Sequence, residues 1–354
     1  MREHSFPTSD DSFDDFSSRP RRSRTSRRRF DDEPGIQVRR GRLTDEERAR
    51  IATQREEFLS ALDVPDGADR WSTWGEGEAG PEPLPSWVIT EQAAVDTLLG
   101  VVKTGKEAEV HLVSRSLPGT GRSVLLAEKR YRSADHRLFH RDAGYLEGRR
   151  TRESRMERAM ANRTTFGRKL IAEQWAAAEF AALCTLWVAG APVPYPLQRV
   201  GTDLLLEFIG DPDGTAAPRL AQLRPTPTEL TDLWSQLCTA LASLASTGYT
   251  HGDLSAYNVL VHHGHLVLID LPQVVDVVSN PNGPELLRRD VQNIGDWFAA
   301  RGLPDVSRRS DELLALLAAE ARIQIPGVPI STRTPGSSRP PAERLRFGPT
   351  TETP

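Results

Sequence analysis

The stretch His251-Gly-Asp-Leu-Ser-Ala-Tyr-Asn258 decides how this chain is interpreted. It holds a carboxylate at Asp253 and, five residues later, an amide at Asn258. Two β-prone runs follow around the turn His263-Gly264, and the second run ends at Asp270. If these runs pair as a hairpin, Asn258 and Asp270 come together at its open end. The stretch therefore predicts one carboxylate beside a hairpin that carries an amide and a second carboxylate.

This set of side chains is the one that phosphoryl transfer from a nucleotide requires. One carboxylate orients the attacking hydroxyl, while an amide and a second carboxylate hold the Mg²⁺ that bridges the phosphates. Asp253 suits the first role, and Asn258 and Asp270 suit the second. An Asp-x4-Asn spacing alone occurs in many chains. Its combination with a preceding His-Gly and a following apolar strand that ends in Asp is far more specific.

A nucleotide phosphate also needs main-chain N–H groups and a cation. The segment Lys103-Thr-Gly-Lys-Glu-Ala-Glu-Val110 supplies a Gly-containing turn between β-prone stretches, although it is not a Walker A motif. Lys129 ends the apolar run VLLAEK, as the nucleotide-anchoring lysine of V-A-I-K does. We predict that Lys129 pairs with Glu179 on the following helix, with Glu173 as the fallback partner.

Secondary-structure signals change in character along residues 86–326. The first half has short β-prone runs and one helical stretch, and the second half is mostly helical. The runs are Val110–Val113, Val124–Ala127 and Leu204–Phe208, and the helical stretches are Phe166–Ala189, Thr228–Thr247 and Leu286–Arg301. We therefore predict an α+β fold with a sheet-rich part followed by a helix-rich part.

Six segments resemble, in order, the core of the RIO family of atypical serine/threonine protein kinases. The similarity spans about residues 86–305 and is greatest to the subgroup with an S/K-T-G-K-E-A phosphate loop. The segments are VVKTGKEAEVHLV, RTTFGRKLIAEQWAAAEFAALCTLWVAGAPVPYPL, LLLEFIG, HGDLSAYNVLV, LVLIDLPQVV and RRDVQNIGDWFAARG. Their shared order makes the resemblance specific, because no single segment would suffice.

The resemblance implies a reduced two-lobed protein-kinase-like fold, with a β-rich N-lobe over residues 86–210 and a helical C-lobe over 211–326. It implies phosphoryl transfer from ATP to protein Ser or Thr, including self-phosphorylation, with Mg²⁺ or alternatively Mn²⁺. It places the catalytic aspartate at Asp253 and the metal ligands at Asn258 and Asp270. The ATP-binding positions are Thr104, Gly105, Lys106, Glu107, Lys129, Glu179 and the hinge residues Glu207, Phe208 and Ile209.

The sequence departs from the family pattern at three places. Ala256 stands where Glu is common, Glu109 stands where Asn or Asp is common, and Leu271-Pro272 replaces a small flexible pair. None of these changes removes a group that the phosphoryl chemistry needs. They leave the geometry of the nucleotide loop and the efficiency of the reaction open.

Three alternative functions remain. In the family, the last metal-binding aspartate can itself be phosphorylated, so Asp270 is a candidate phospho-acceptor of an ATPase switch that acts on a ribosomal or RNA partner. A non-catalytic RNA-binding protein would use the same basic segments. A degenerate kinase, however, rarely keeps the lysine, the catalytic aspartate, the asparagine and the metal-binding aspartate together, and this chain has all four. Aminoglycoside-kinase-like enzymes share the His-Gly-Asp-x4-Asn loop, whereas the K-T-G-K-E-A segment argues against that class.

Charge is unevenly distributed along the chain. The 354 residues carry 45 Lys and Arg against 49 Asp and Glu, which excludes a uniformly basic nucleic-acid-binding protein. Two segments are nonetheless basic: residues 19–29 hold seven Arg and no acid, and residues 130–169 hold twelve Arg and Lys against five acids. They are candidates for contact with RNA, a ribosomal partner or an acidic protein substrate. Solvated charge is the alternative explanation for both.

The ends of the chain are poor in core-forming residues. We expect a disordered Arg-rich tail over residues 1–43, a short helix and linker over 44–85, and a disordered tail over 327–354. No apolar run is long enough to span a membrane, and no secretory signal is visible. Cys184 and Cys238 are expected to be ordinary thiols of a cytoplasmic protein.

Four histidines lie near the central motif. We expect His251 to brace the catalytic loop through main-chain contacts rather than act as a base. His262, His263 and His265 are expected to belong to a polar hairpin rather than a metal site, because no Cys or acid accompanies them in the sequence.

Overall fold

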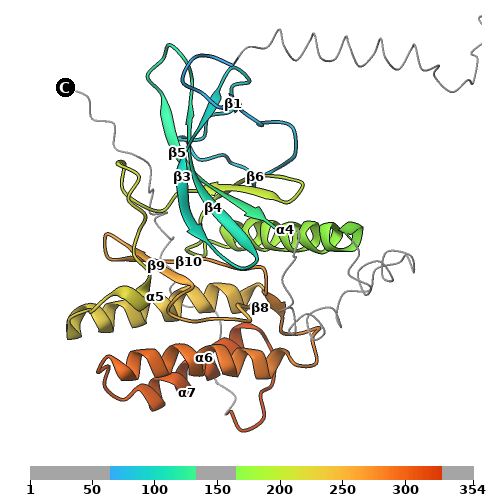
Figure 1. The fold of residues 1–354 in the computed structure, drawn as a ribbon. Coiled ribbons are helices and arrows are strands. Elements are labelled where there is room, and N and C mark those ends of the chain that lie inside the picture. Colours follow the sequence, from blue (N-terminus) through green and yellow to red (C-terminus); the bar gives the residue numbers. More distant parts are fainter. Residues whose placement is uncertain (1–63, 133–164, 329–354) are drawn as a thin grey trace, which may run out of the picture. The chain divides into compact units, whose positions relative to one another are not determined.

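A computed structural model describes residues 64–132 and 165–328, with the main chain alone over 165–169 (Figure 1). The chain divides into two units, Met1–Leu62 and Asp63–Pro354, and every described residue belongs to the second. The predictions for residues 1–43, the helix from residue 44, and nearly all of the basic segment 130–169 and of the tail 327–354 therefore lie outside the described residues.

Seven strands of the described part form one antiparallel sheet in the order β1-β3-β4-β5-β7-β6-β2. Buried and less buried residues alternate along β5, as expected for a strand with one face on a core. The strands are β1 (Arg70–Trp71), β2 (Glu78–Ala79), β3 (Val95–Thr104), β4 (Ala108–Ser116), β5 (Ser123–Tyr131), β6 (Pro196–Val200) and β7 (Asp203–Glu207).

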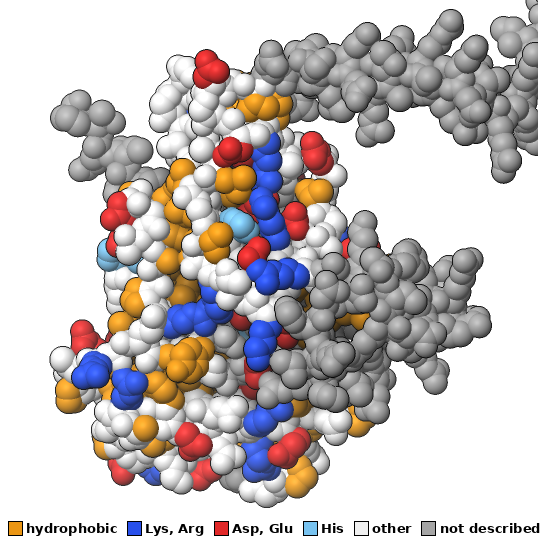
Figure 2. Space-filling view, in the orientation of Figure 1, with side chains coloured by type: hydrophobic (Ala, Val, Ile, Leu, Met, Phe, Trp, Pro, Cys, Tyr) orange, Lys and Arg blue, Asp and Glu red, His pale blue; other side chains and the backbone are white. Residues whose placement is uncertain are grey.

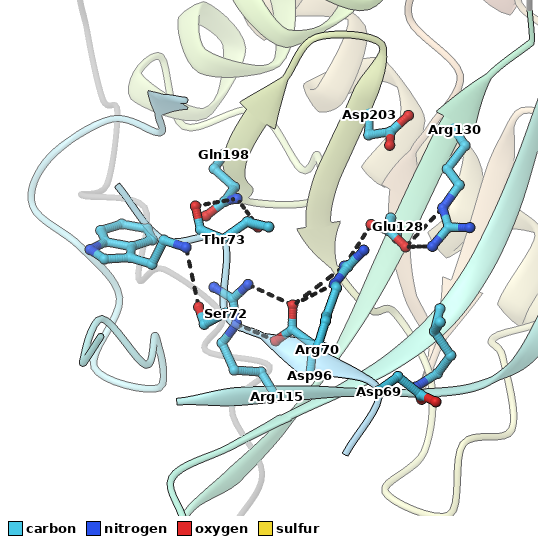
Figure 3. Close-up of polar contacts among 12 residues, drawn as sticks. Asp69, Arg70, Ser72, Thr73, Asp96, Arg115, Glu128, Arg130, Gln198 and Asp203 are labelled. Atoms are coloured by element: carbon cyan, nitrogen blue, oxygen red, sulfur yellow. Dashed lines mark hydrogen bonds and ion pairs between the residues drawn. The ribbon is translucent and has the colours of Figure 1, made fainter. Parts of the chain in front are cut away.

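Residues 64–85, where a linker was predicted, contribute two short strands to this sheet. Strand β1 pairs with β3, and β2 pairs with β6. A buried ion network secures the first of these strands (Figure 3). The Arg70 guanidinium contacts Glu128 at 2.7 Å and Asp96 at 3.3 Å, and Asp96 also binds the fully buried Arg115 at 2.7 Å. The two-residue strand is too short to be predicted from hydrophobic alternation.

Helix α4 (Thr165–Val188) lies against the sheet, near β5, β6 and β7 (Figure 1). Its bounds agree with the predicted stretch to within one residue. Trp175, Phe180, Leu183 and Leu186 are buried and share one hydrophobic cluster with Leu204 of β7. These side chains recur at helical spacing, so the same face of α4 turns toward the core along its length.

The second part of the chain is helical, with one short hairpin and one further pair of two-residue strands. Helix α5 begins where Thr226 and Glu229 form a capping box and Pro227 occupies the first turn. The elements are η1 (Leu220–Gln222), α5 (Pro227–Ser246), α6 (Gly283–Ala300), α7 (Val306–Glu320), the pair β8 (Tyr249–Thr250) and β11 (Val275–Asp276), and the pair β9 (Val259–His262) and β10 (His265–Leu268).

One hydrophobic cluster joins the sheet-bearing and helical parts. It includes Phe180 of α4, Leu237 of α5, Leu268 of β10 and Phe298 of α6. The predicted α+β fold, with a sheet-rich part before a helix-rich part, is therefore confirmed. Among the described residues, every helix is too short or too polar to span a bilayer.

Candidate active site

The loop that carries Asp253 runs from β8 to β9 and is held by a carboxylate of α6. Asp290 is almost completely buried, at 1% exposure. It accepts hydrogen bonds from Thr250 Oγ1 at 2.7 Å, Gly252 N at 2.7 Å and Leu254 N at 3.0 Å. The bonds from Gly252 N and Leu254 N fix the main chain on both sides of Asp253, and the third bond holds the Thr250 side chain. Sequence reasoning missed Asp290, because a single Asp in an amphipathic helix carries no signal of its own.

The same loop needs glycine at position 252. Gly252 has a φ of 80°, and a Cβ at this position would lie 2.1 Å from the carbonyl oxygen of Gln273. Any larger residue would combine an unfavourable φ with a main-chain clash. The loop therefore lies tightly against the segment that follows Asp270.

His251 braces the loop, as predicted. Its Nε2 lies 3.1 Å from the carbonyl oxygen of Ile269, and its side chain is fully buried. The predicted hairpin is also present as β9 and β10. The N–H of Ile269 donates to the carbonyl of Asn258 at 3.0 Å, so Asn258 and the residue before Asp270 meet at the open end.

Lys129 forms the predicted ion pair with Glu179 and a second one with Asp270. Its Nζ lies 2.7 Å from Glu179 Oε1 and 2.8 Å from Asp270 Oδ1. Burial disfavours the charged lysine, but the two carboxylates outweigh that effect and raise the pKa of Lys129. The nearby Lys129 charge lowers the pKa of Asp270 to about 2 against the opposing effect of burial. Lys129 and Asp270 are therefore both charged at neutral pH. Lys129 pairs with Glu179 and not with the fallback candidate Glu173.

Glu179 accepts further hydrogen bonds that the sequence did not indicate. The Tyr131 hydroxyl donates to Oε2, and the N–H of Leu271 donates to Oε1 at 3.1 Å. Burial and the Glu179 charge raise the pKa of Tyr131, so its hydroxyl keeps its proton. Leu271 follows Asp270 directly, so Glu179 holds both the lysine and the backbone beside the aspartate.

The predicted phosphate loop joins β3 and β4. Gly105 N donates to Ala108 O at 2.9 Å and closes the turn, while Thr104 and Lys106 are exposed. Lys103 precedes this turn and interacts electrostatically with Asp270. Partial desolvation, together with the Arg219 and Lys129 charges, lowers the pKa of Lys103. Lys103 therefore brings a second cation toward Asp270, which sequence reasoning had not assigned.

The predicted hinge begins at Glu207, the last residue of β7. The Glu207 side chain is buried and accepts the N–H of Tyr195 at 3.0 Å. Burial raises the pKa of Glu207 to about 7, and the bond from Tyr195 opposes that shift. The carbonyl of Ile209 accepts the N–H of Ala217 at 3.0 Å, so the hinge main chain is tied to the segment beyond it.

The residues at the hairpin end fit a magnesium–nucleotide complex. Asn258 Nδ2 donates to Asp253 O at 3.0 Å, and this bond sets the orientation of the amide. Asp270 has a φ of 65°, a conformation that is uncommon outside glycine and clusters at functional sites, and its side chain is 38% exposed. An amide oxygen and a carboxylate are the hard donors that Mg²⁺ prefers.

The histidine hairpin differs from its prediction in one respect. Asp211 supplies the acid that the local sequence lacks, with its Oδ1 at 3.1 Å from His262 Nε2 and 3.4 Å from His263 Nε2. Asp211 lies about fifty positions earlier in the chain, so this contact could not be anticipated from local sequence.

Comparison with known proteins places the chain in a family. A family profile described as "RIO domain" matches residues 130–311, which is more than half of the chain. The chain belongs to the RIO family. The matched region includes Glu179, Asp253, Asn258 and Asp270, whereas Lys129 and the β3–β4 turn precede it and are placed by the geometry above.

Curated RIO relatives share about a third of their aligned residues with the chain. The serine/threonine-protein kinase RIO1 of Chaetomium thermophilum is 32% identical over 225 residues, which cover 61% of this chain and 42% of that protein. The RIO-type serine/threonine-protein kinase Rio1 of Haloferax volcanii is 32% identical over 214 residues, which cover 60% of this chain and 67% of that protein. The chain thus spans less than half the length of the first relative and about two thirds of the second.

Among solved structures, the RIO family chain is similar to the Rio2 kinase–ADP/Mg²⁺–phosphoaspartate complex from Chaetomium thermophilum. The match has 22% sequence identity and a TM-score of 0.43, and it covers 63% of this chain and 66% of that one.

Proposed function

We propose that this RIO-family chain transfers the γ-phosphoryl group of Mg-ATP to Ser or Thr hydroxyls of a protein substrate. The observation that carries the proposal is the position of Lys129 Nζ between Glu179 and Asp270, at 2.7 and 2.8 Å. This arrangement joins β5, α4 and the end of the β9–β10 hairpin at one point. The same activity is supported by curated relatives that are named serine/threonine-protein kinases and are 32% identical to the chain.

Each residue has a distinct part in this proposal. Asp253 accepts the proton of the attacking hydroxyl, and Asn258 and Asp270 hold the metal. Lys129 and the exposed Lys106 neutralise charge on phosphate oxygens, and the main chain at Gly105 approaches them closely. When bound, Mg²⁺ would offset the negative charge that develops on the phosphate oxygens during transfer. Manganese is the alternative metal, since it also accepts oxygen donors.

A second candidate activity is ATP hydrolysis through phosphorylation of Asp270. The carboxylate is charged and partly exposed, which suits a nucleophile. Its oxygen would attack the γ-phosphorus, ADP would leave, and water would later hydrolyse the acyl phosphate to restore Asp270 and release inorganic phosphate. The ion pair with Lys129 opposes this role, because a paired carboxylate is a weaker nucleophile.

One experiment separates the two activities. The full chain is incubated with Mg²⁺ and ATP labelled at the γ-phosphate, together with a generic protein substrate. The kinase proposal predicts label on Ser or Thr that resists hydroxylamine. Label that hydroxylamine removes, and that disappears in Asp270→Ala, would instead support the ATPase. No transfer of either kind would contradict both.

We also propose a cytoplasmic protein that meets a ribosomal or RNA partner through segments 19–29 and 130–169. Their Arg content is the support, since clustered cations bind phosphate backbones in a salt-dependent way. Over the described residues, the face in Figure 2 shows Lys and Arg side chains interspersed with acidic and apolar ones. Deleting residues 19–29 should therefore weaken RNA retention in filter binding and reduce its salt dependence.

A further inference from the structure

Three side chains outside the candidate active site converge on one point. His262 ends β9, His263 begins the β9–β10 turn, and Asp211 lies two residues beyond the hinge. Their candidate donor atoms all lie within 4.8 Å of one another. Two imidazole nitrogens and one carboxylate oxygen form a donor set that proteins use for zinc.

The loop that carries Asp211 is closed by main-chain hydrogen bonds. Asp211 N donates to Thr215 O at 2.8 Å, and Gly214 N donates to Asp211 O at 3.0 Å. A β-bridge between Gly210 and Ala216 closes the base of this loop. The carboxylate therefore projects from a short, internally bonded turn.

The hairpin that carries both histidines is equally well defined. His263 and Gly264 have φ values of 48° and 79°, the conformation of the two-residue turns that suit antiparallel hairpins. Gln236 of α5 donates to Gly264 O at 2.9 Å and accepts from Leu266 N at 3.0 Å. The turn is thus anchored to a helix, which fixes the main chain beside the two histidines.

The two donor spacings that involve Asp211 match tetrahedral coordination. With zinc bonds of about 2.0–2.2 Å to nitrogen and oxygen, neighbouring ligand atoms are separated by roughly 3.3 Å. Asp211 Oδ1 lies 3.1 Å from His262 Nε2 and 3.4 Å from His263 Nε2. His263 is 71% exposed, so the site opens to solvent and leaves room for a water ligand.

The geometry points to a zinc site formed by Asp211, His262 and His263, separate from the proposed magnesium site. Imidazole nitrogens favour Zn²⁺, Ni²⁺ or Cu²⁺, whereas Mg²⁺ favours oxygen donors throughout. A bound ion would join the loop after the hinge to the hairpin that begins after Asn258 and ends before Asp270. The expected consequence is a structural clamp beside the candidate active site.

Zinc titration of the metal-free full chain tests this site. Isothermal titration calorimetry should show one Zn²⁺ per chain, and zinc should raise the thermal unfolding midpoint. Asp211→Asn and His263→Gly should each weaken binding by at least about tenfold and abolish the zinc-dependent rise in midpoint. Gly suits the positive φ at position 263, so the second variant should keep the turn.

His265→Ala is the matched control, because His265 lies on the same hairpin outside the cluster. It should bind zinc as the wild type does. Equal zinc affinity in the wild type and the Asp211→Asn/His263→Gly double variant would overturn the proposal, since zinc would then bind elsewhere. Absence of zinc binding to the wild type would show that the three side chains form hydrogen bonds only. Neither result bears on the kinase proposal.

Discussion

At the scale of single residues, Glu179 explains why Lys129 has a defined position. The carboxylate accepts from Lys129, from the Tyr131 hydroxyl and from the N–H of Leu271. A carboxylate with several donors cannot rotate away without leaving buried groups unpaired. The Lys129–Glu179 pair was predictable from sequence, because both residues lie in recognisable apolar frames. Tyr131 and Leu271 N were not, because their roles depend on how β5, α4 and the hairpin meet.

Tyr131→Phe should lower kcat by about tenfold and change the KM for ATP less. The variant removes one charge-assisted hydrogen bond, worth about 1.5–3 kcal/mol in typical cases, from the group that positions Lys129. Steady-state kinetics with varied ATP would check this split. Tyr257→Phe is the control, since Tyr257 is 64% exposed and should leave both constants unchanged. An unchanged kcat in Tyr131→Phe would mean that Glu179 is positioned without Tyr131.

Glu207 should make folding stability depend on pH. Its pKa is raised by burial to about 7 in the folded protein, above the ordinary value of 4.5. The folded state therefore binds the proton more tightly, and this contribution to stability is complete below about pH 4.5 and lost as pH rises through 7. The loss amounts to about 3 kcal/mol.

Urea unfolding of the wild type and Glu207→Gln between pH 5 and 8 would measure this contribution. The wild type should lose stability toward pH 8 relative to the variant, whose amide cannot ionise and can still accept the Tyr195 N–H. Parallel pH profiles for the two proteins would show that Glu207 does not titrate in this range.

At the scale of elements, α6 supports the loop that carries Asp253. One carboxylate on this helix replaces the hydrogen bonds that Gly252 N and Leu254 N would otherwise make with water. The helix itself was predictable from its apolar spacing, as were α4 and α5. Helix α7 was not predicted. Strands β1 and β2 were not predicted either, because each has only two residues and depends on pairing with a distant segment.

Asp290→Ala should destabilise the protein by about 3 kcal/mol or more and sharply reduce kcat. The change leaves two buried N–H groups and the Thr250 hydroxyl without their acceptor. Denaturant unfolding and turnover measurements would check both effects. Asp296→Ala is the matched control, because Asp296 is an exposed carboxylate on the same helix and should change stability by less than about 0.5 kcal/mol. Wild-type turnover in a folded Asp290→Ala protein would contradict the supporting role.

At the scale of the whole described unit, two features hold distant parts together: the shared hydrophobic cluster and the buried ions of the sheet. Asp96 and Arg115 are both fully buried and paired at 2.7 Å (Figure 3). The pairing order of the sheet, and with it this network, could not be read from sequence. Antiparallel pairing between β5 and β7 spans more than seventy residues, and local patterns do not specify such partners.

Asp96→Ala should lower the free energy of unfolding by about 3–5 kcal/mol, because Arg115 would remain buried without its partner. The surface pair Glu91–Arg122 provides the comparison, and Glu91→Ala should change the free energy of unfolding far less, because water solvates both of these charges. Both values follow from urea unfolding curves. Equal costs for the two variants would indicate that water reaches Arg115 and replaces Asp96.

The central claim is that Asp253 acts on the attacking hydroxyl at a site where Lys129, Asn258 and Asp270 hold Mg-ATP. Measuring ATP affinity and phosphate transfer in the same preparation of Asp253→Asn tests it most directly. The claim predicts that Asp253→Asn binds Mg-ATP with the same dissociation constant as the wild type. It also predicts that the rate of phosphate transfer falls by about 10²–10⁴-fold. Transfer at the wild-type rate in a variant that binds ATP normally would contradict it.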